Sequence, residues 1–189
     1  MTDLFTDNAS FDAPLDVLHA CHGRIRRQLG TLERLARHLP VAGSDADARA
    51  AARAILKYFD GAAPNHHADE EQSLFPRLVA AASSPAAALV DTLARQHEEL
   101  AAMWLRLRPD LAAVAAGARS VLTPALVRRV RAAYFDHIDR EETELLPLAA
   151  ERLDAATLAT IGAEMAHRRG LPYPAPSDGP SSSGRAVSS

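Results

Sequence analysis

Two apolar stripes in this sequence each include one histidine, and this pattern limits what the chain can fold into. Their members recur every three or four residues, a spacing that puts them on one face of a long helix. The first stripe consists of Leu15, Leu18, His22, Ile25, Leu29, Leu32, Ala36 and Leu39. The second consists of Val90, Leu93, His97, Leu100, Trp104, Leu107 and Leu111. Each stripe therefore predicts a helix that buries one imidazole, and a buried imidazole needs a partner.

Two further stretches predict helices whose inner faces carry a histidine and a glutamate together. The inner positions of the first are Ile55, Phe59, Ala62, His66, Glu70, Leu74 and Leu78. Those of the second are Leu126, Val130, Tyr134, His137, Glu141, Leu145 and Leu148. Because each glutamate follows its histidine by four residues, the two side chains lie one turn apart on the same side of the helix.

Helix-start signals separate these stretches. Ser44, followed three residues later by Asp47, predicts a capped start for the helix that carries His66. Ser84-Pro85 and Thr123-Pro124 predict the starts of the next two helices, because a capping residue followed by proline is favoured at that position. Four long helices are the result.

The order of these helices predicts the fold. Aromatic residues make up 5% of the chain, and the abundant alanine and leucine favour helices. We predict an all-α fold: an up-down-up-down antiparallel four-helix bundle with a short additional C-terminal helix from about Asp154 to Arg169. The predicted domains are a flexible N-terminus over residues 1–13, the bundle over 14–170 and a disordered tail rich in Pro, Ser and Gly over 171–189.

Charge and cysteine content exclude several classes of partner. The net charge is −3 and no basic block is present, so we expect no nucleic-acid partner. No run reaches the roughly 18 apolar residues of a membrane span, so we expect no membrane partner. Cys21 stands alone, off the first stripe, and the N-terminus lacks the features of a signal peptide. A cytoplasmic location is therefore predicted, whereas the oligomeric state stays open.

An internal repeat carries the chemistry of the sequence. The segments 66–76 and 137–147 both read His-x3-Glu-Glu-x2-Leu-hydrophobic-Pro. The stripe histidines His22 and His97 precede them by 44 and 40 residues. The chain thus resembles two similar helical hairpins, each of which supplies two histidines and one glutamate to the interior.

These residue types predict a site for two metal ions. Imidazole nitrogens and carboxylate oxygens together suit iron or manganese, and a carboxylate can bridge two ions. The absence of paired cysteines argues against structural zinc and iron–sulfur clusters. A single buried histidine is usually a hydrogen-bonded core residue. Four imidazoles and two carboxylates in one core would instead cost several kcal/mol without cations.

At these residues the sequence resembles the hemerythrin-like (HHE cation-binding) domain family, over about Leu15 to Leu148. The resemblance implies a non-haem di-iron cofactor, with manganese as the other possible metal. It implies bridging roles for the two repeat glutamates. The implied ligands are His22, His66, Glu70, His97, His137 and Glu141.

The sequence departs from the oxygen-carrying members of that family at two positions. Those members have a second histidine one turn after the third-helix ligand, where this chain has Ala101. Their last carboxylate aligns with Glu142, so Glu141 or Glu142 is the bridging group at this point. His67 and Glu71 form a second pair spaced by four residues, rotated about 100° from His66 and Glu70 on the helix. By the repeat alignment His67 corresponds to Ile138, so His67 is interpreted as an outer-layer or surface residue, and the role of Glu71 stays open.

The resemblance implies a protein that binds O2 or a related small diatomic or peroxide ligand for sensing, storage or iron handling. Two alternatives stay open: a di-iron oxidoreductase acting on peroxide or nitric oxide, and a metal-free helical interaction module. A metal- or oxygen-binding protein is favoured over a dedicated enzyme. His19, one turn before His22, either contacts the site or faces solvent.

Overall fold

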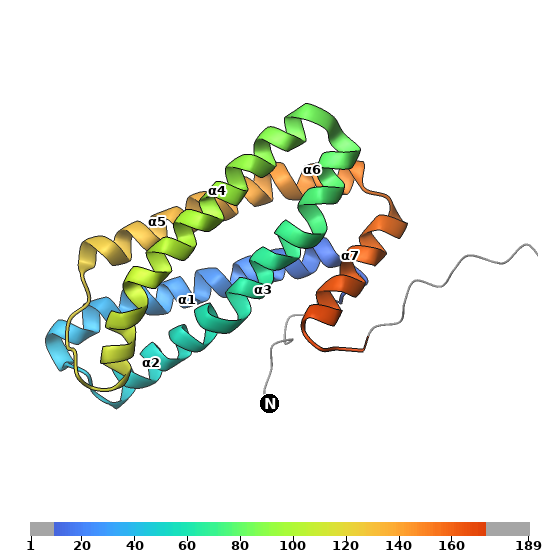
Figure 1. Ribbon diagram of the computed structural model, residues 1–189. Coiled ribbons are helices and arrows are strands. Elements are labelled where there is room, and N and C mark those ends of the chain that lie inside the picture. The colour runs from blue at the N-terminus through green and yellow to red at the C-terminus, as the bar shows by residue number, and fades with distance from the viewer. Residues whose placement is uncertain (1–9, 173–189) are drawn as a thin grey trace, which may run out of the picture.

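The computed structural model describes residues 10–172, apart from the side chains of residues 83–85. All secondary structure in this range is helical, which confirms the all-α prediction there (Figure 1). The predicted flexible start and disordered tail lie largely on residues 1–9 and 173–189, outside the described residues. The elements are α1 (Pro14–Ala42), α2 (Ala46–Lys57), η1 (Tyr58–Ala62), α3 (Ala63–Ala68), η2 (Asp69–Leu74), α4 (Phe75–Ala115), α5 (Pro124–Arg140), η3 (Glu141–Leu145), α6 (Leu146–Arg152) and α7 (Ala155–Arg168).

The first predicted stripe is the buried face of α1. Its large apolar members from Leu18 to Leu39 are buried together with His22, as their spacing predicts. The buried face is wider than the stripe, however, since Cys21 is only 6% exposed. Cys21 lies off the predicted stripe and is buried all the same, because α1 is covered on more than one side.

The predicted start of the second helix was wrong by one residue. Gly43, with φ of 68°, follows α1 in a conformation that suits glycine. Asp45 is the N-cap of α2, and its carboxylate accepts a hydrogen bond from the Ala48 N–H at 2.8 Å. The Ser44 hydroxyl instead donates to the backbone carbonyl of Arg119, so it is not available to the helix.

No loop separates the second and third predicted helices. Helical segments follow one another from Ala46 to Ala115, and Ser84-Pro85 lies inside α4 rather than at a helix start. The ribbon nevertheless reverses direction within the green part of α4 (Figure 1). Contacts across the hairpin are antiparallel, because Arg108 pairs with Asp60 while His97 pairs with Glu71.

The helix α1 runs antiparallel to the helix that carries the second repeat. Arg26 forms two hydrogen bonds with Glu142, and farther along α1 Glu33 pairs with Arg131 of α5. In the described residues no helix is long and apolar enough to cross a membrane. The four long stretches thus lie alongside one another, with their inner faces turned toward a common interior.

The core consists of two apolar clusters with a polar layer between them. One cluster contains Ile25 and Leu100, and the other contains Leu18 and Leu93. His22 falls between Leu18 and Ile25 in the first stripe. In the second stripe His97 likewise falls between Leu93 and Leu100. The apolar clusters therefore close the polar layer from both ends of the bundle.

Three π-helical segments interrupt the helices, and two of them coincide with the repeat. A π-helix pairs residue i with residue i+5, which widens the turn by one residue. The segment η2 begins one residue before Glu70, and η3 begins at Glu141. The same local geometry thus recurs beside the same glutamate in both halves, a location typical of functional sites.

The short helix α7 covers the end of the bundle beside η2. Asp154 caps it by accepting a hydrogen bond from the Thr157 N–H at 2.8 Å, as the predicted helix from Asp154 requires. At its other end Arg168 and Arg169 both pair with the fully buried Asp69, the residue before Glu70. The C-terminal helix therefore holds the segment that carries a predicted ligand.

Replacing Gly162 by alanine is expected to destabilise the protein by about 1–3 kcal/mol, the usual cost of forcing an extra methyl group into a packed interior. The new Cβ would overlap the backbone carbonyl oxygen of Phe11. Urea unfolding followed by circular dichroism measures the change. Gly61→Ala is the matched control, because open space surrounds that position and alanine favours a helix. Equal unfolding midpoints for G162A and wild type would contradict this packing.

Candidate metal centre

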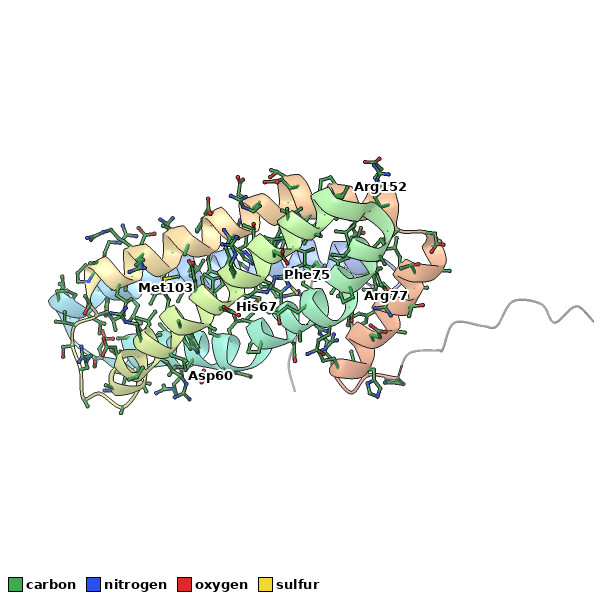
Figure 2. All side chains as sticks on the ribbon, turned by 45° about the horizontal axis from the view of Figure 1, so that its top comes forward. Asp60, His67, Phe75, Arg77, Met103 and Arg152 are labelled. Atoms are coloured by element: carbon green, nitrogen blue, oxygen red, sulfur yellow. The ribbon has the colours of Figure 1, made fainter. Side chains whose placement is uncertain are left out.

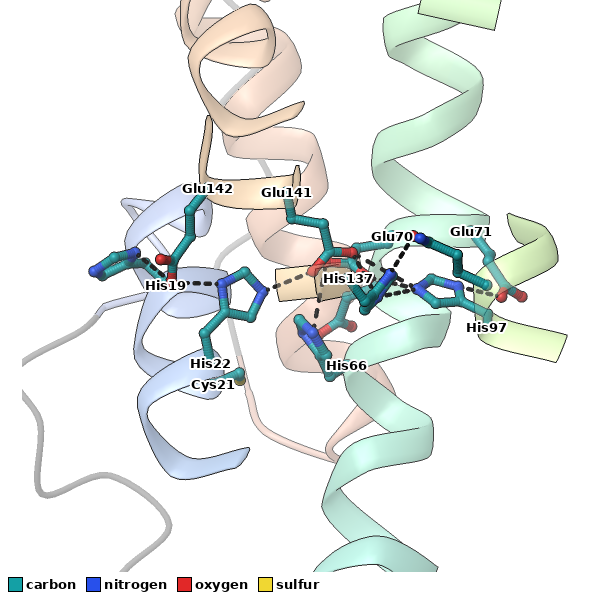
Figure 3. A network of polar contacts seen from close by, with 12 residues as sticks. His19, Cys21, His22, His66, Glu70, Glu71, His97, His137, Glu141 and Glu142 are labelled. Carbon is teal, nitrogen blue, oxygen red and sulfur yellow. Dashed lines mark hydrogen bonds and ion pairs between the residues drawn. The ribbon is translucent and has the colours of Figure 1, made fainter. Parts of the chain in front are cut away.

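The six predicted ligands meet in the polar layer of the core. His22 comes from α1, His66 from α3 and His97 from α4. Glu70, His137 and Glu141 come from η2, α5 and η3, respectively. Every one of these side chains is at most 3% exposed, and they converge on one point between the helices (Figure 3).

The ligands form two overlapping clusters that share both glutamates. Within each cluster the potential ligand atoms lie within 4.8 Å of one another. The first cluster is His22, His66, Glu70 and Glu141. The second cluster is His97, His137, Glu70 and Glu141. Two ions that shared both carboxylates would therefore each have two imidazoles of their own.

Each glutamate has one oxygen on each side of this arrangement. Glu70 places Oε1 3.6 Å from His66 Nε2 and Oε2 3.3 Å from His97 Nε2. Glu141 places Oε2 3.1 Å from His22 Nε2 and Oε1 3.0 Å from His137 Nε2. Each carboxylate could therefore contact a cation in both clusters.

The distances between donor atoms suit a bound cation. Ligands about 2.1 Å from a metal and at right angles to each other are about 3.0 Å apart. The Nε2 atoms of His97 and His137 are 3.1 Å apart, close to this value. Both imidazoles thus turn the same nitrogen toward one point.

Many donor atoms of the site lack a hydrogen-bond partner within the described residues. They include both carboxylate oxygens of Glu70 and of Glu141, Nε2 of His22 and both ring nitrogens of His66. An unsatisfied buried polar atom costs about 1–3 kcal/mol, and more when it is charged. The residues therefore fit a group that would accept these lone pairs, as a pair of cations would.

Sequence comparison agrees with this donor set. Residues 13–149 match the family model of the hemerythrin HHE cation binding domain. The chain belongs to the hemerythrin HHE cation-binding family. It is also 34% identical, over 161 residues, to an uncharacterized protein of Haemophilus influenzae, a match that covers 85% of this chain and 92% of that protein. The predicted resemblance is therefore confirmed, and a metal-binding role is consistent with the buried clusters.

The electrostatics of this hemerythrin-family site reflect its burial. Burial, together with the charge of Glu141, raises the pKa of Glu70 well above its usual value. Burial also acts to raise the pKa of Glu141, but the close imidazoles of His137, His22 and His97 outweigh it and lower that pKa. Burial lowers the pKa of His66 well below its usual value. The imidazole of His66 is therefore neutral, the form that can bind a metal ion.

Two outer carboxylates hold the histidines of the opposite hairpins. Glu142 accepts a hydrogen bond from Nδ1 of His22 at 3.1 Å, and Glu71 accepts one from Nδ1 of His97 at 2.7 Å. With Nδ1 as donor, Nε2 of each ring is left toward the clusters. The side-chain oxygen of Gln96 accepts a hydrogen bond from Nδ1 of His137 at 3.0 Å. The two hairpins thus orient each other's ligands.

This arrangement distinguishes the two glutamates of the second repeat. Glu141 lies between the clusters, whereas Glu142 faces outward and is held by the guanidinium of Arg26 at 2.7 and 2.8 Å. That guanidinium lowers the pKa of Glu142. The sequence analysis did not predict that Glu142 and Glu71 would orient the histidines. The second glutamate of the Glu-Glu pair, present in both repeats, was the signal that could have indicated this role.

The remaining histidines near the site differ in exposure. The side chain of His19 is 66% exposed, lies 3.3 Å from the outer Glu142, and has its ring centroid 6.3 Å from that of His22. His67 is half-buried, and its ring stacks on His97 with centroids 4.0 Å apart. Ala101 is exposed and belongs to neither cluster. Of these residues, only His67 approaches the ligand atoms of the second cluster.

Replacing Glu142 or Glu71 by alanine is expected to weaken metal binding about 10–100-fold, the usual loss when an outer partner of a ligand is removed. Each ring would lose the acceptor that fixes its orientation. Competition with a fluorescent chelator measures the affinity. Glu144→Ala is the matched control, because Glu144 is exposed and pairs only with Arg140 among the described residues. Identical affinities for all three variants would show that the outer carboxylates do not orient the ligands.

Proposed function

We propose that this hemerythrin-family chain binds two non-haem iron ions and, through them, O2 or a related small ligand for sensing, storage or iron handling. One observation carries the proposal: each of two buried glutamates has one carboxylate oxygen at each of two histidine clusters. The proposed ligands are His22, His66, Glu70, His97, His137 and Glu141. Manganese is the other metal that this donor set would suit.

The proposal assumes the predicted up-down-up-down four-helix bundle. Antiparallel contacts between α1 and α5, and across the hairpin that leads into α4, support this topology. In such a bundle inward-facing residues of all four helices reach one layer. The cytoplasmic location inferred from the single cysteine stays a prediction.

The buried carboxylates of the site favour a bound cation such as iron over an uncharged molecule. Two carboxylates and four imidazoles are held in a layer closed by apolar side chains such as Leu18 and Ile25. When bound, ferrous iron would supply the electrons and open coordination positions that O2 or peroxide chemistry needs. The protein's own part is to hold the imidazoles of His22, His97 and His137 by their Nδ1 atoms and to exclude bulk water.

A surface groove favours a second candidate, a di-iron oxidoreductase acting on peroxide or nitric oxide. The groove, of about 450 Å³, is lined by Glu71, Phe75 and other residues of η2 and α4. Glu71 also accepts the hydrogen bond from His97, and the Phe75 ring stacks on that imidazole with centroids 5.9 Å apart. Glu71 and Phe75 thus line the groove and contact the candidate ligand His97, so a reactant that binds in the groove would lie one side chain away from the site.

Replacing His66 or His137 by alanine is expected to cut bound iron by more than half and leave the protein helical. Each variant loses one imidazole, whereas the leucine-rich clusters that hold the bundle stay intact. Metal analysis after anaerobic Fe(II) loading, with circular dichroism of the same samples, checks both parts. His38→Ala is the control, because His38 pairs with Asp45 far from the site. Unchanged iron in both variants would contradict the ligand assignment.

Reaction with O2 separates the functional candidates. The diferrous protein is expected to react on mixing with O2 and to develop the near-ultraviolet absorption of an oxo-bridged ferric pair. Sustained consumption of peroxide or nitric oxide with an electron donor would favour the oxidoreductase. Wild-type protein that holds less than about 0.2 iron per chain after loading would oppose both and favour a metal-free interaction module.

A further inference from the structure

Asp69, the residue before the predicted ligand Glu70, is held by the C-terminal end of α7. Its side chain is fully buried, and both of its carboxylate oxygens accept hydrogen bonds from arginines there. Arg169 donates from two nitrogens, at 2.6 and 3.1 Å, and Arg168 donates to Oδ1. Paired, charge-assisted hydrogen bonds of this kind fix a buried carboxylate in place, because the loss of a partner would leave its charge without compensation.

The same helix also holds the residues that follow Glu70. Arg168 donates a second hydrogen bond, to the Ser73 hydroxyl at 3.2 Å. Figure 2 shows Arg77 beside α7, where it forms two hydrogen bonds with Glu164 at 2.6 and 3.0 Å. Arg77 also donates to the Ser73 carbonyl at 2.8 Å. The π-helical segment η2, which contains Glu70, is therefore tied to α7 on both sides of this ligand.

The wide turn of η2 gives these ties a consequence for Glu70. A π-helical turn is rare and contains one residue more than an α-helical turn. If η2 returned to α-helical spacing, the residues before and after the extra one would rotate relative to each other by about 100°. Glu70 would then leave its position between His66 and His97, whose Nε2 atoms lie 3.6 and 3.3 Å from its two oxygens.

The repeat does not account for this tie. In the repeat alignment Asp69 corresponds to Arg140, whose ion pair among the described residues is with Glu144 of the following turn, at 3.8 Å. The family match ends at residue 149, whereas α7 begins at Ala155. The position of Glu70 thus depends on a helix outside the part of the chain that the family model covers.

We propose that Arg168 and Arg169 are positioning residues: through Asp69 they keep Glu70 between the two metal clusters, and they couple the docking of α7 to metal binding. The inference rests on the proposed metal-binding function. Such coupling is reciprocal. The factor by which docked α7 raises the metal affinity is also the factor by which bound metal stabilises docked α7. Metal occupancy is therefore conveyed to a helix at the end of the bundle (Figure 1).

Charge and position predict opposite results for the variant that combines Arg168→Gln with Arg169→Gln. Loss of two positive charges near a cation site would by itself strengthen metal binding. Loss of the tie is expected to weaken it instead, by about 10–100-fold, as for other outer partners of a ligand. Competition with a fluorescent chelator during anaerobic Fe(II) titration measures the affinity. The control is Arg152→Gln, because Arg152 is exposed and pairs with Glu151.

Hydrogen exchange tests the coupling in the other direction. In the wild-type protein we expect Fe(II) to slow amide exchange in α7 more than in α2, which lies at the opposite end of the bundle (Figure 1). In the R168Q/R169Q protein iron should no longer slow α7 selectively. The wild-type comparison does not depend on the folding of any variant, so it decides the question if the R168Q/R169Q protein is unfolded.

Two results would overturn the inference. One is a R168Q/R169Q protein that is helical by circular dichroism and binds Fe(II) as tightly as wild type, or more tightly. The other is equal slowing of α7 and α2 in iron-loaded wild type, which would show that metal only stabilises the bundle as a whole. Wild-type protein that binds no iron would instead contradict the proposed function, which is a different outcome.

Discussion

The structure depends on two carboxylates buried between two pairs of imidazoles. Glu70 and Glu141 are fully buried, and their oxygens lack hydrogen-bond partners within the described residues. A core that simply needed stability would have apolar side chains here, because a buried ionic group without full compensation is destabilising. The apolar clusters on both sides instead keep the layer dry, which strengthens its attraction for cations. Stability and metal affinity are therefore opposed in the metal-free protein and combined in the loaded one.

The polar layer could be predicted from the sequence because a histidine at an apolar position of a helical stripe is a clear departure from the pattern. A histidine within an apolar stripe, as at His22 or His97, places an imidazole in the interior whatever the details of packing. The four-residue spacing of His66 and Glu70 then places both groups on one side of a helix. These arguments use only distances along one helix. That is why they located the residues that the structure brings together in the two clusters.

Features that depend on neighbouring helices were not predictable in this way. Cys21 lies off the first stripe, so its spacing did not predict burial, yet it is buried because α1 is covered on more than one side. Asp45 rather than Ser44 caps α2, since both residue types can cap and a tertiary contact uses the serine. The π-helical segments beside Glu70 and Glu141 were not predicted, because the residue spacing of a regular helix does not show where a turn widens. His67, rotated about 100° from His66 on the helix, was predicted to lie in an outer layer or at the surface, but helical spacing alone could not show that its ring stacks on His97.

The two halves are alike in their ligands and different in what surrounds them. Glu142 is held by Arg26 and is 20% exposed, whereas Glu71 is 45% exposed and lines the surface groove. The residue before His97 is Gln96, which accepts a hydrogen bond from His137. The residue before His22 is Cys21, and Nδ1 of His66 has no such partner among the described residues. A duplicated hairpin explains why the ligand types match, whereas the residues next to the ligands differ between the halves. These differences all lie one residue away from a ligand, where they change its orientation and access without removing it.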